Sequence, residues 1–132
     1  MSDLLVDTQA MTRLVEGQRE LPAAACRRFE DGAGRRLFSV ASLWEMAIKM
    51  NIGKLTLTSG SIQGFAEILT LHGAESLPVT SPEAMDVASL PADRHHDPFD
   101  RLIAAQCLRH GLPLLSIDAA FDAYGVERVW SR

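Results

Sequence analysis

Short apolar runs alternate with helix-like segments along the chain, and this alternation constrains the fold more than any other feature of the sequence. Strands are predicted at the apolar runs 4–6, 36–40, 75–79, 114–117 and 128–130. Helices are predicted between them, at 9–16, from about 22, at 42–50, 61–73 and 82–90, and from 98. Strands that alternate with helices across short connections imply an α/β fold, with a mainly parallel central sheet between helical layers.

The bulk properties of the chain are those of a folded globular protein. Its 132 residues suit one domain, 1–132, and 47% hydrophobic with 23% charged residues is an ordinary composition. No apolar run approaches the ~20 residues that span a bilayer, and acids stand where a signal peptide carries positive charge, so we expect a cytoplasmic protein with no membrane partner. The formal charge of −4 argues against nucleic-acid binding through a general basic surface. Cys26 and Cys107 lack metal-site spacing and are expected to be buried thiols.

Four acidic residues lie at junctions between a predicted strand and a helix. Asp7 and Asp118 directly follow strands, whereas Glu45 and Asp100 fall in the first turn of predicted helices. In a parallel α/β domain these junctions share one edge of the sheet, which is where ligands bind. Crowded carboxylates repel one another unless a proton or a cation compensates, and oxygen ligands suit Mg²⁺ or Mn²⁺. The four acids are therefore candidate metal ligands.

Each of these acids also has a structural interpretation as a helix cap. Asp97 precedes Pro98 and matches an N-cap with proline at the first helical position, which places Asp100 at the third position of a capping box. Ser42 and Glu45 match the same box, and Asp7 and Asp118 can each cap the helix after a strand. Spacing alone favours capping, most clearly for Asp97.

Two details favour a metal-binding role for these acids over capping alone. Asp100 shares a helical face with three apolar residues, Ile103, Ala104 and Cys107, so its side chain is expected to point inward. The third strand is followed by Ser81, which is predicted to cap the next helix without an acid in the ligand position. Acids at the other junctions therefore have a reason beyond capping.

Four longer motifs occur in a recognisable order and separation, and span essentially the whole chain: LLVDTQA, SVASLWEMAIKMNIGKLTL, HHDPFDRLIAAQ and LLSIDAAFDAYGVERVW. Together they resemble the PIN-domain family, specifically the VapC-like toxins of bacterial type II toxin–antitoxin pairs. The resemblance implies a three-layer α/β/α PIN-like sandwich in which the first strand lies between the second and the fourth, with the third remote. It also implies that Asp7, Glu45, Asp100 and Asp118 form the family's acidic quartet.

The function that the resemblance implies is a metal-dependent ribonuclease that leaves 5′-phosphate and 3′-hydroxyl ends. The quartet would be both catalytic and metal-binding: Asp7, Glu45 and Asp100 would hold one Mg²⁺ or Mn²⁺, and Asp118 would assist a second ion or orient the attacking water. The expected partners are an RNA substrate, a cognate antitoxin and a second copy of the chain in a homodimer.

Three further residues receive supporting roles. Asp97 is expected to order the helix start, Ser116 to offer a hydroxyl beside the acids or simply to end a strand, and Arg101 to contact phosphate or lie on a solvated face. Gln9 departs from the family, where histidine is common, so a role of an imidazole in substrate handling or proton transfer is not expected here, and the acids do not depend on it.

Several neighbours of the acids have plain structural interpretations. Lys49 is expected to form a surface ion pair with Glu45, and His95 and His96 to lie in a polar loop. The side chains expected to pack in the core are Trp44, Met46 and Met50.

Two alternative functions remain. The first is a PIN-like scaffold that binds RNA or an antitoxin without cleaving, which the intact quartet disfavours. The second is phosphoryl transfer as in receiver or phosphatase domains, which the absence of a second aspartate in VDTQ disfavours.

Overall fold

A parallel sheet forms the centre of the protein. The computed structural model describes residues 3–17, 22–30, 34–92 and 96–130. Within these ranges the strands are β1 (Leu4–Val6), β2 (Arg36–Ser39), β3 (Ala74–Leu77), β4 (Leu114–Leu115) and β5 (Arg128–Val129). Their order is β3-β2-β1-β4-β5, and every neighbouring pair is parallel. The expected order, with the first strand between the second and the fourth, is confirmed.

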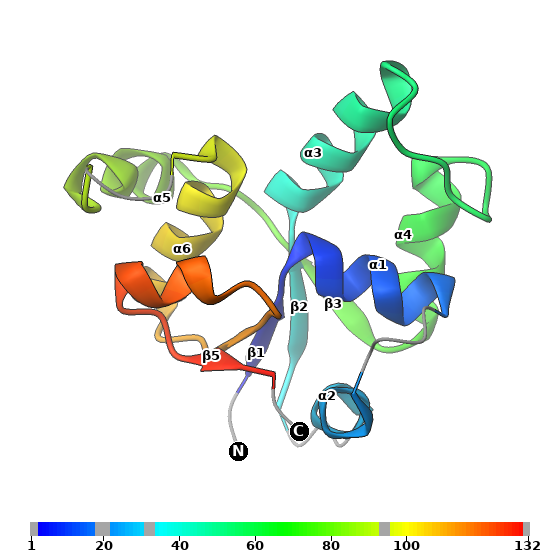
Figure 1. Ribbon diagram of the computed structural model, residues 1–132, viewed down its shortest axis with the longest axis horizontal. Helices are drawn as coiled ribbons and strands as arrows, with labels where there is room; N and C mark the ends of the chain where they lie inside the picture. Colours follow the sequence, from blue (N-terminus) through cyan, green and yellow to red (C-terminus); the bar gives the residue numbers. More distant parts are fainter. Residues whose placement is uncertain (1–2, 18–21, 31–33, 93–95, 131–132) are drawn as a thin grey trace.

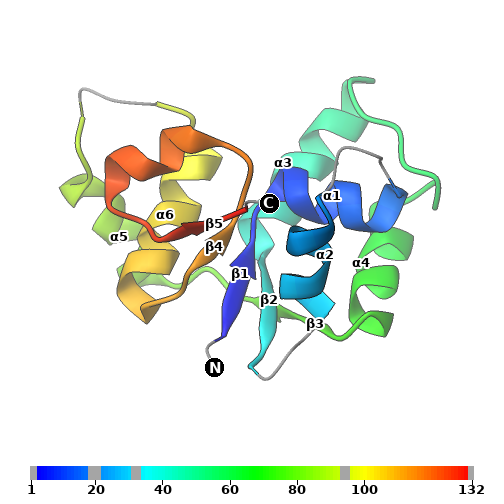
Figure 2. The same cartoon turned by 60° about the horizontal axis from the view of Figure 1, so that its bottom comes forward.

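Helices cover both faces of this sheet. They are α1 (Thr8–Glu16), α2 (Ala23–Glu30), α3 (Val40–Asn51), α4 (Ile62–Leu71), α5 (Ser81–Asp86) and α6 (Pro98–His110), with short 3₁₀ helices η1 (Val87–Ser89) and η2 (Ala119–Tyr124). Figure 2 shows α1, α2 and α4 on one side of the strands, and α5 and α6 on the other. The expected three-layer α/β/α arrangement is confirmed.

The apolar run of β1 explains why the sheet is covered twice. Leu4 and Val6 belong to a core cluster shared with α1, α2 and α4, whereas Leu5 belongs to a second cluster shared with α6 and η2. Alternate residues of a strand point to opposite faces, so a continuous apolar run requires a buried environment on both. Helix α3 leaves the sheet edge and contributes to both clusters, through Met46 on one side and Ala41 on the other.

The start of α3 differs from the prediction. Strand β2 ends at Ser39, and the Ser39 hydroxyl caps α3 by accepting a hydrogen bond from the backbone N of Ala41 at 3.0 Å. Ser42 lies inside the helix and is buried, so the predicted capping box of Ser42 with Glu45 is wrong. Glu45 falls in the second turn of α3 instead of the first, and capping does not account for it.

The start of α5 also differs. Thr80, not Ser81, is the N-cap, and it forms a complete capping box with Glu83. With this cap, Glu83 occupies the third helical position, as Asp100 does in α6, so the prediction of no acid in that position is wrong. Glu83 is nevertheless turned away from the sheet edge, because its buried carboxylate accepts hydrogen bonds from Gln106 Nε2 at 3.0 Å and from His110 Nε2 on α6.

The surface of α3 corrects one core prediction. Met46 is buried as expected and Met50 is half-buried, but the Trp44 side chain is 60% exposed and meets Phe99 edge-on, with ring centroids 5.1 Å apart. Figure 1 shows α3 extending away from the sheet, and Ile48 on this helix is also exposed. In the described part of the chain, no helix combines the length and the apolar character that crossing a membrane requires.

Candidate active site

A cavity of about 230 Å³ lies where the carboxyl ends of the central strands meet the starts of the following helices. It is lined by Asp7, Thr8, Gln9, Glu45, Lys49, Asp97, Asp100 and Asp118. All four acids predicted as ligands line it, together with the predicted cap Asp97. They come from four separate segments, and the adjacency of β1 and β4 brings Asp7 and Asp118 to the same edge.

Asp7 is the most deeply buried acid of the cavity, with an exposed fraction of 4%. It caps α1, since its Oδ1 accepts from the backbone N of Ala10 at 2.8 Å, and its Oδ2 accepts from the Ser116 hydroxyl. Burial raises the pKa of Asp7 to about 6; these two hydrogen bonds oppose the rise, and the negative charges of Asp100 and Asp118 add to it. An ionised Asp7 is therefore short of compensating positive charge.

Ser116 connects two of the acids. Its hydroxyl donates to Asp7 and accepts from the backbone N of Asp118 at 3.0 Å, and the side chain is fully buried. Asp118 in turn caps η2, because its Oδ1 accepts from the backbone N of Ala120 at 2.9 Å. Ser116 therefore orients carboxylates from beneath the cavity, and it is not among the residues that line it.

Glu45 is held by two polar neighbours. Thr8 Oγ1 donates to Glu45 Oε1 at 2.9 Å, and Lys49 Nζ lies 3.0 Å from Glu45 Oε2. The predicted ion pair with Lys49 is confirmed, although Glu45 is buried and only the lysine is exposed to solvent. Sequence reasoning missed Thr8; its position directly after Asp7, at the start of a helix, was the available signal.

The start of α6 carries two acids that line the cavity, and only Asp97 is its N-cap. Asp97 Oδ1 accepts from the backbone N of Phe99 at 2.9 Å and of Asp100 at 3.0 Å, which confirms the predicted cap. Asp100 lies one turn further on, half-buried at the cavity.

Arg101 lies apart from the cavity lining. It donates to the Pro91 carbonyl at 2.9 Å, and its guanidinium lies 5.7 Å from the centroid of the Tyr124 ring. Of the two predicted loop histidines, His96 is exposed and His95 falls outside the described residues.

The two cysteines play no visible part in the cavity. Cys107 is buried, and burial with the nearby charge of Asp7 raises the pKa of its thiol to about 12, so it behaves as an inert apolar side chain. Cys26 is only half-buried, which corrects its predicted burial.

The donor chemistry of the cavity fits a hard divalent cation. Among the residues described, no group of three or more His, Cys, Asp or Glu side chains is already arranged to hold a metal ion. The acids that line the cavity nevertheless offer only oxygen donors, the ligands that Mg²⁺ and Mn²⁺ prefer. A cation there would also offset the repulsion of Asp100 and Asp118 that raises the pKa of Asp7.

Comparison of the sequence with known protein families identifies the family of this chain. The PIN domain family matches residues 4–127, almost the whole chain. The chain belongs to the PIN domain family. No curated protein is significantly similar to it in sequence.

Three solved structures share the fold of this PIN domain. Mycobacterium tuberculosis VapC20, described as a sarcin–ricin loop cleaving toxin, superposes with a TM-score of 0.69 at 14% identity, over 97% of this chain and 99% of that one. VapBC2 from Rickettsia felis, bound to a DNA fragment from its promoter, gives 0.73 at 14% identity, over 99% and 100%. FitAcB from Neisseria gonorrhoeae gives 0.62 at 21% identity, over 97% and 96%. At these identities the likeness concerns the fold.

Proposed function

We propose that this PIN domain is a metal-dependent endoribonuclease that acts in the cytoplasm as the toxin of a type II toxin–antitoxin pair. The observation that carries the proposal is the convergence of Asp7, Glu45, Asp100 and Asp118 from four segments onto one cavity. Capping explains Asp7 and Asp118 in part, but it does not explain Glu45, which lies inside α3 and is buried against the cavity. A ribonuclease with a carboxylate metal site requires this kind of convergence.

The proposed roles follow from the position of each side chain. Asp7, Glu45 and Asp100 would hold Mg²⁺ or Mn²⁺, and Asp118 would orient the attacking water or assist a second ion. When bound, the metal would lower the pKa of water and offset the charge that develops on the phosphate. Hydrolysis would form a bond from water oxygen to phosphorus and break the bond to O3′, which leaves 5′-phosphate and 3′-hydroxyl ends.

Supporting residues would hold this set in place. Ser116 orients Asp7 from beneath, and Asp97 fixes the start of the helix that carries Asp100. Arg101 is kept as a candidate phosphate contact on the nearby surface.

The proposed protein partners are an antitoxin and a second copy of the chain. The structures of VapBC2 and FitAcB, which share this fold, are the motivation for an antitoxin. A row of exposed apolar side chains runs along α3 to its C-cap at intervals of four residues and supports a homodimer: Val40, Trp44, Ile48 and Ile52. One helical face with this much apolar surface is typical of a protein–protein interface.

RNA cleavage by purified, antitoxin-free protein tests the enzyme. Total bacterial RNA is incubated with Mg²⁺, with Mn²⁺ or with a chelator, and new 5′ ends are mapped. We expect cleavage with metal only, and its loss in Asp7→Asn and Asp100→Asn. The matched control is Asp86→Asn, which removes a half-buried carboxylate of α5 that pairs with Arg109 outside the cavity lining, and which should cleave normally.

Two results would contradict the enzyme. Cleavage that persists in the chelator would show that the reaction does not depend on a metal. Undiminished cleavage by Asp7→Asn would show that Asp7 is not part of the site. RNA binding without cleavage by the unmodified chain would favour the catalytically inactive scaffold.

A further inference from the structure

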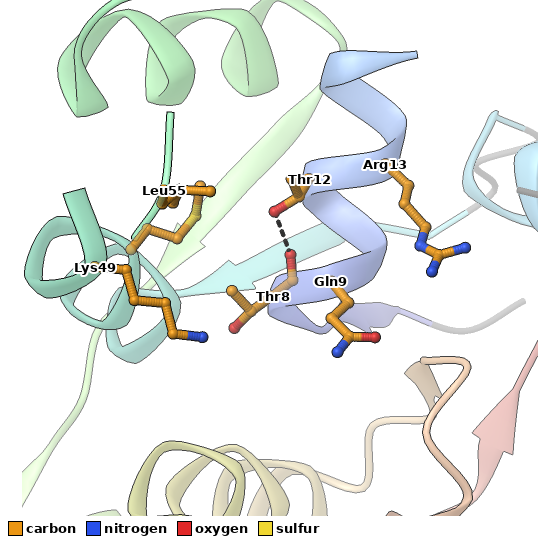
Figure 3. Close-up of a pocket in the computed structure, with 7 residues that line it drawn as sticks. Thr8, Gln9, Thr12, Arg13, Lys49 and Leu55 are labelled. Atoms are coloured by element: carbon orange, nitrogen blue, oxygen red, sulfur yellow. Dashed lines mark hydrogen bonds between the residues drawn. The ribbon is translucent and has the colours of Figure 1, made fainter. Parts of the chain in front are cut away.

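A second cavity adjoins the acidic one, between α1 and α3 (Figure 3). Its volume is about 250 Å³, and it is lined by Thr8, Gln9, Thr12, Arg13, Met46, Lys49 and Leu55. Thr8, Gln9 and Lys49 line both cavities. A molecule in the second cavity therefore lies directly beside the carboxylates.

The polar side of this second cavity is built by the first turns of α1. Thr8 and Thr12 stand one turn apart, as do Gln9 and Arg13, and the Thr12 hydroxyl donates to the Thr8 carbonyl at 2.7 Å. Figure 3 shows Lys49 reaching toward Thr8 from α3, while Arg13 lies on the other side of Gln9. The Thr8–Gln9 pair is thus flanked by two cationic side chains.

Arg13 carries the clearest sign that a ligand is expected. In the described part of the chain, its Nη1 is a buried nitrogen that has no hydrogen-bond partner. A buried donor without an acceptor costs free energy, and a guanidinium suits the oxygens of a phosphate. Because Nη1 is covered, the Arg13 side chain would have to turn toward the cavity that it lines for an anionic ligand there to supply the missing acceptor.

The opposite wall of the second cavity is apolar. Met46 belongs to the core cluster and is 1% exposed, and the half-buried Leu55 packs against the same cluster. Unstacked bases of single-stranded RNA stack on aromatic rings or Arg guanidinium planes, and bases held in enzyme pockets also lie against apolar side chains. The volume is below the ~300–1,000 Å³ of pockets for drug-sized ligands, which limits the occupant to about one nucleotide unit.

We propose that this second cavity binds the nucleotide next to the scissile phosphodiester of an RNA strand, with Arg13 on its phosphate, Met46 and Leu55 against its base, and Gln9 on the base edge. The proposal rests on the ribonuclease function above and adds a specificity subsite to it. Gln9 suits the last role because its exposed amide both donates and accepts hydrogen bonds. Arg13 and Gln9 thus contribute separately, to affinity and to the choice of base.

Kinetics on a synthetic single-stranded RNA, which contains the site mapped for the unmodified chain, test the role of Arg13. We expect Arg13→Gln to raise KM about tenfold with kcat nearly unchanged, because a charge-assisted hydrogen bond to the bound strand is lost. In the non-cleaving Asp7→Asn background, the same change should lower the slope of log K against log salt by about 0.7, the value for one phosphate contact. Arg27→Gln removes an exposed charge from α2 and is the matched control, with no change in either quantity.

The role of Gln9 is tested by mapping cleavage sites in total RNA with Gln9→Ala. The side chain is exposed, so this variant reports on recognition and not on folding. We expect the base preference beside the cut to relax while cleavage continues.

The two proposals fail in different ways. If the unmodified chain does not cleave RNA with metal, the ribonuclease function is wrong and the subsite with it. If the chain cleaves but Arg13→Gln leaves KM and the salt slope unchanged, and Gln9→Ala leaves the base preference unchanged, the subsite alone is wrong. The second cavity would then be left to a protein partner.

Discussion

The Ser116 hydroxyl donates a hydrogen bond to Oδ2 of Asp7 across 109 positions of sequence. Because Ser116 Oγ also accepts a hydrogen bond from the backbone N of Asp118, one buried hydroxyl sets the positions of two acids of the candidate site. Ser116 directly follows β4, and β4 pairs with β1, so the contact between Ser116 and Asp7 becomes possible.

Replacement of Ser116 by Ala should lower stability and activity together. The change leaves Asp7 Oδ2 and the Asp118 amide without a buried partner, at a cost of about 1–3 kcal/mol in the free energy of unfolding. Urea unfolding at neutral pH measures this loss. Ser76→Ala, at an exposed position of β3, is the control and should change the free energy by less than ~0.5 kcal/mol. Equal stability of the two variants would show that the Ser116 contacts are not stabilising.

Replacement of Asp7 by Asn should stabilise the metal-free protein while it abolishes cleavage. The pKa of the folded-state carboxyl, about 6, lies above its ordinary 3.8, so unfolding free energy falls as pH rises from about 4 to about 6 and stays low above that. Asn has no charge to bury, so the free energy of unfolding of the variant should exceed that of the unmodified chain by up to about 3 kcal/mol at pH 7.5. Below pH ~4 the two should be equal.

Thermal unfolding with and without metal completes this test. Mg²⁺ or Mn²⁺ should raise the Tm of the unmodified chain at pH 7.5 and leave that of Asp7→Asn almost unchanged, because a ligand stabilises only the state that binds it. An equal metal response in both proteins would place the cation elsewhere.

Asp97 can be tested as a cap independently of its charge. Asp97→Ala should destabilise the protein by about 1 kcal/mol and lower kcat, since the start of α6 would no longer hold Asp100 in place. Asp97→Ser keeps a capping oxygen without a carboxylate and should restore most of both. If Asp97→Ser is stable but inactive, Asp97 acts through its charge, as a ligand would.

Glu83→Gln should reveal a buried polar contact far from the acids. Burial alone would raise the pKa of Glu83, but hydrogen bonds from His110, the Thr80 amide and Gln106 outweigh it and hold the pKa below its ordinary value. We expect Glu83→Gln to lower the free energy of unfolding by about 1–3 kcal/mol at neutral pH. The difference between the variant and the unmodified chain should shrink below the ordinary pKa of about 4.5, where acid protonates Glu83. Urea unfolding between pH 3 and pH 7 measures it; a loss that does not change with pH would contradict a role for the charge.

Trp44→Ser tests the proposed dimer. The substitution removes the largest exposed apolar side chain of the α3 row, so self-association should weaken at least tenfold in sedimentation experiments. Leu71→Ser on α4 removes a residue that is 85% exposed and lies outside this row, and should leave association unchanged. A stable dimer of Trp44→Ser would place the interface elsewhere.

Local patterns in the sequence predicted most elements and the cap of α6. Asp97, Pro98 and the apolar spacing after them define α6 within a few residues, because capping hydrogen bonds join near neighbours in the chain. The errors at Ser42 and Ser81 have the same origin: Ser39 and Thr80 are equally good caps, and the choice depends on where the preceding strand stops pairing. The sheet register, not the local sequence, sets that point.

The acids that line the cavity could be expected from the sequence, but Thr8 and the contacts among the side chains could not. The PIN-like motifs brought Asp7, Glu45 and Asp100 together in advance, and the cavity contains all of them. The contact of Thr8 with Glu45 and the second cavity between α1 and α3 depend on how two helices pack. No local sequence pattern encodes the spacing between α1 and α3.

The sequence by itself determined an alternating α/β chain with acids at its strand–helix junctions, because strand periodicity, helix periodicity and capping are all short-range. Tertiary structure decided which of those acids meet. Pairing of β1 with both β2 and β4 gathers Asp7 and Asp118, whereas the packing of α5 on α6 holds Glu83 in hydrogen bonds with Gln106 and His110. Tertiary structure also leaves Trp44 exposed, since burial depends on the elements that pack over a residue and not on its place along a helix.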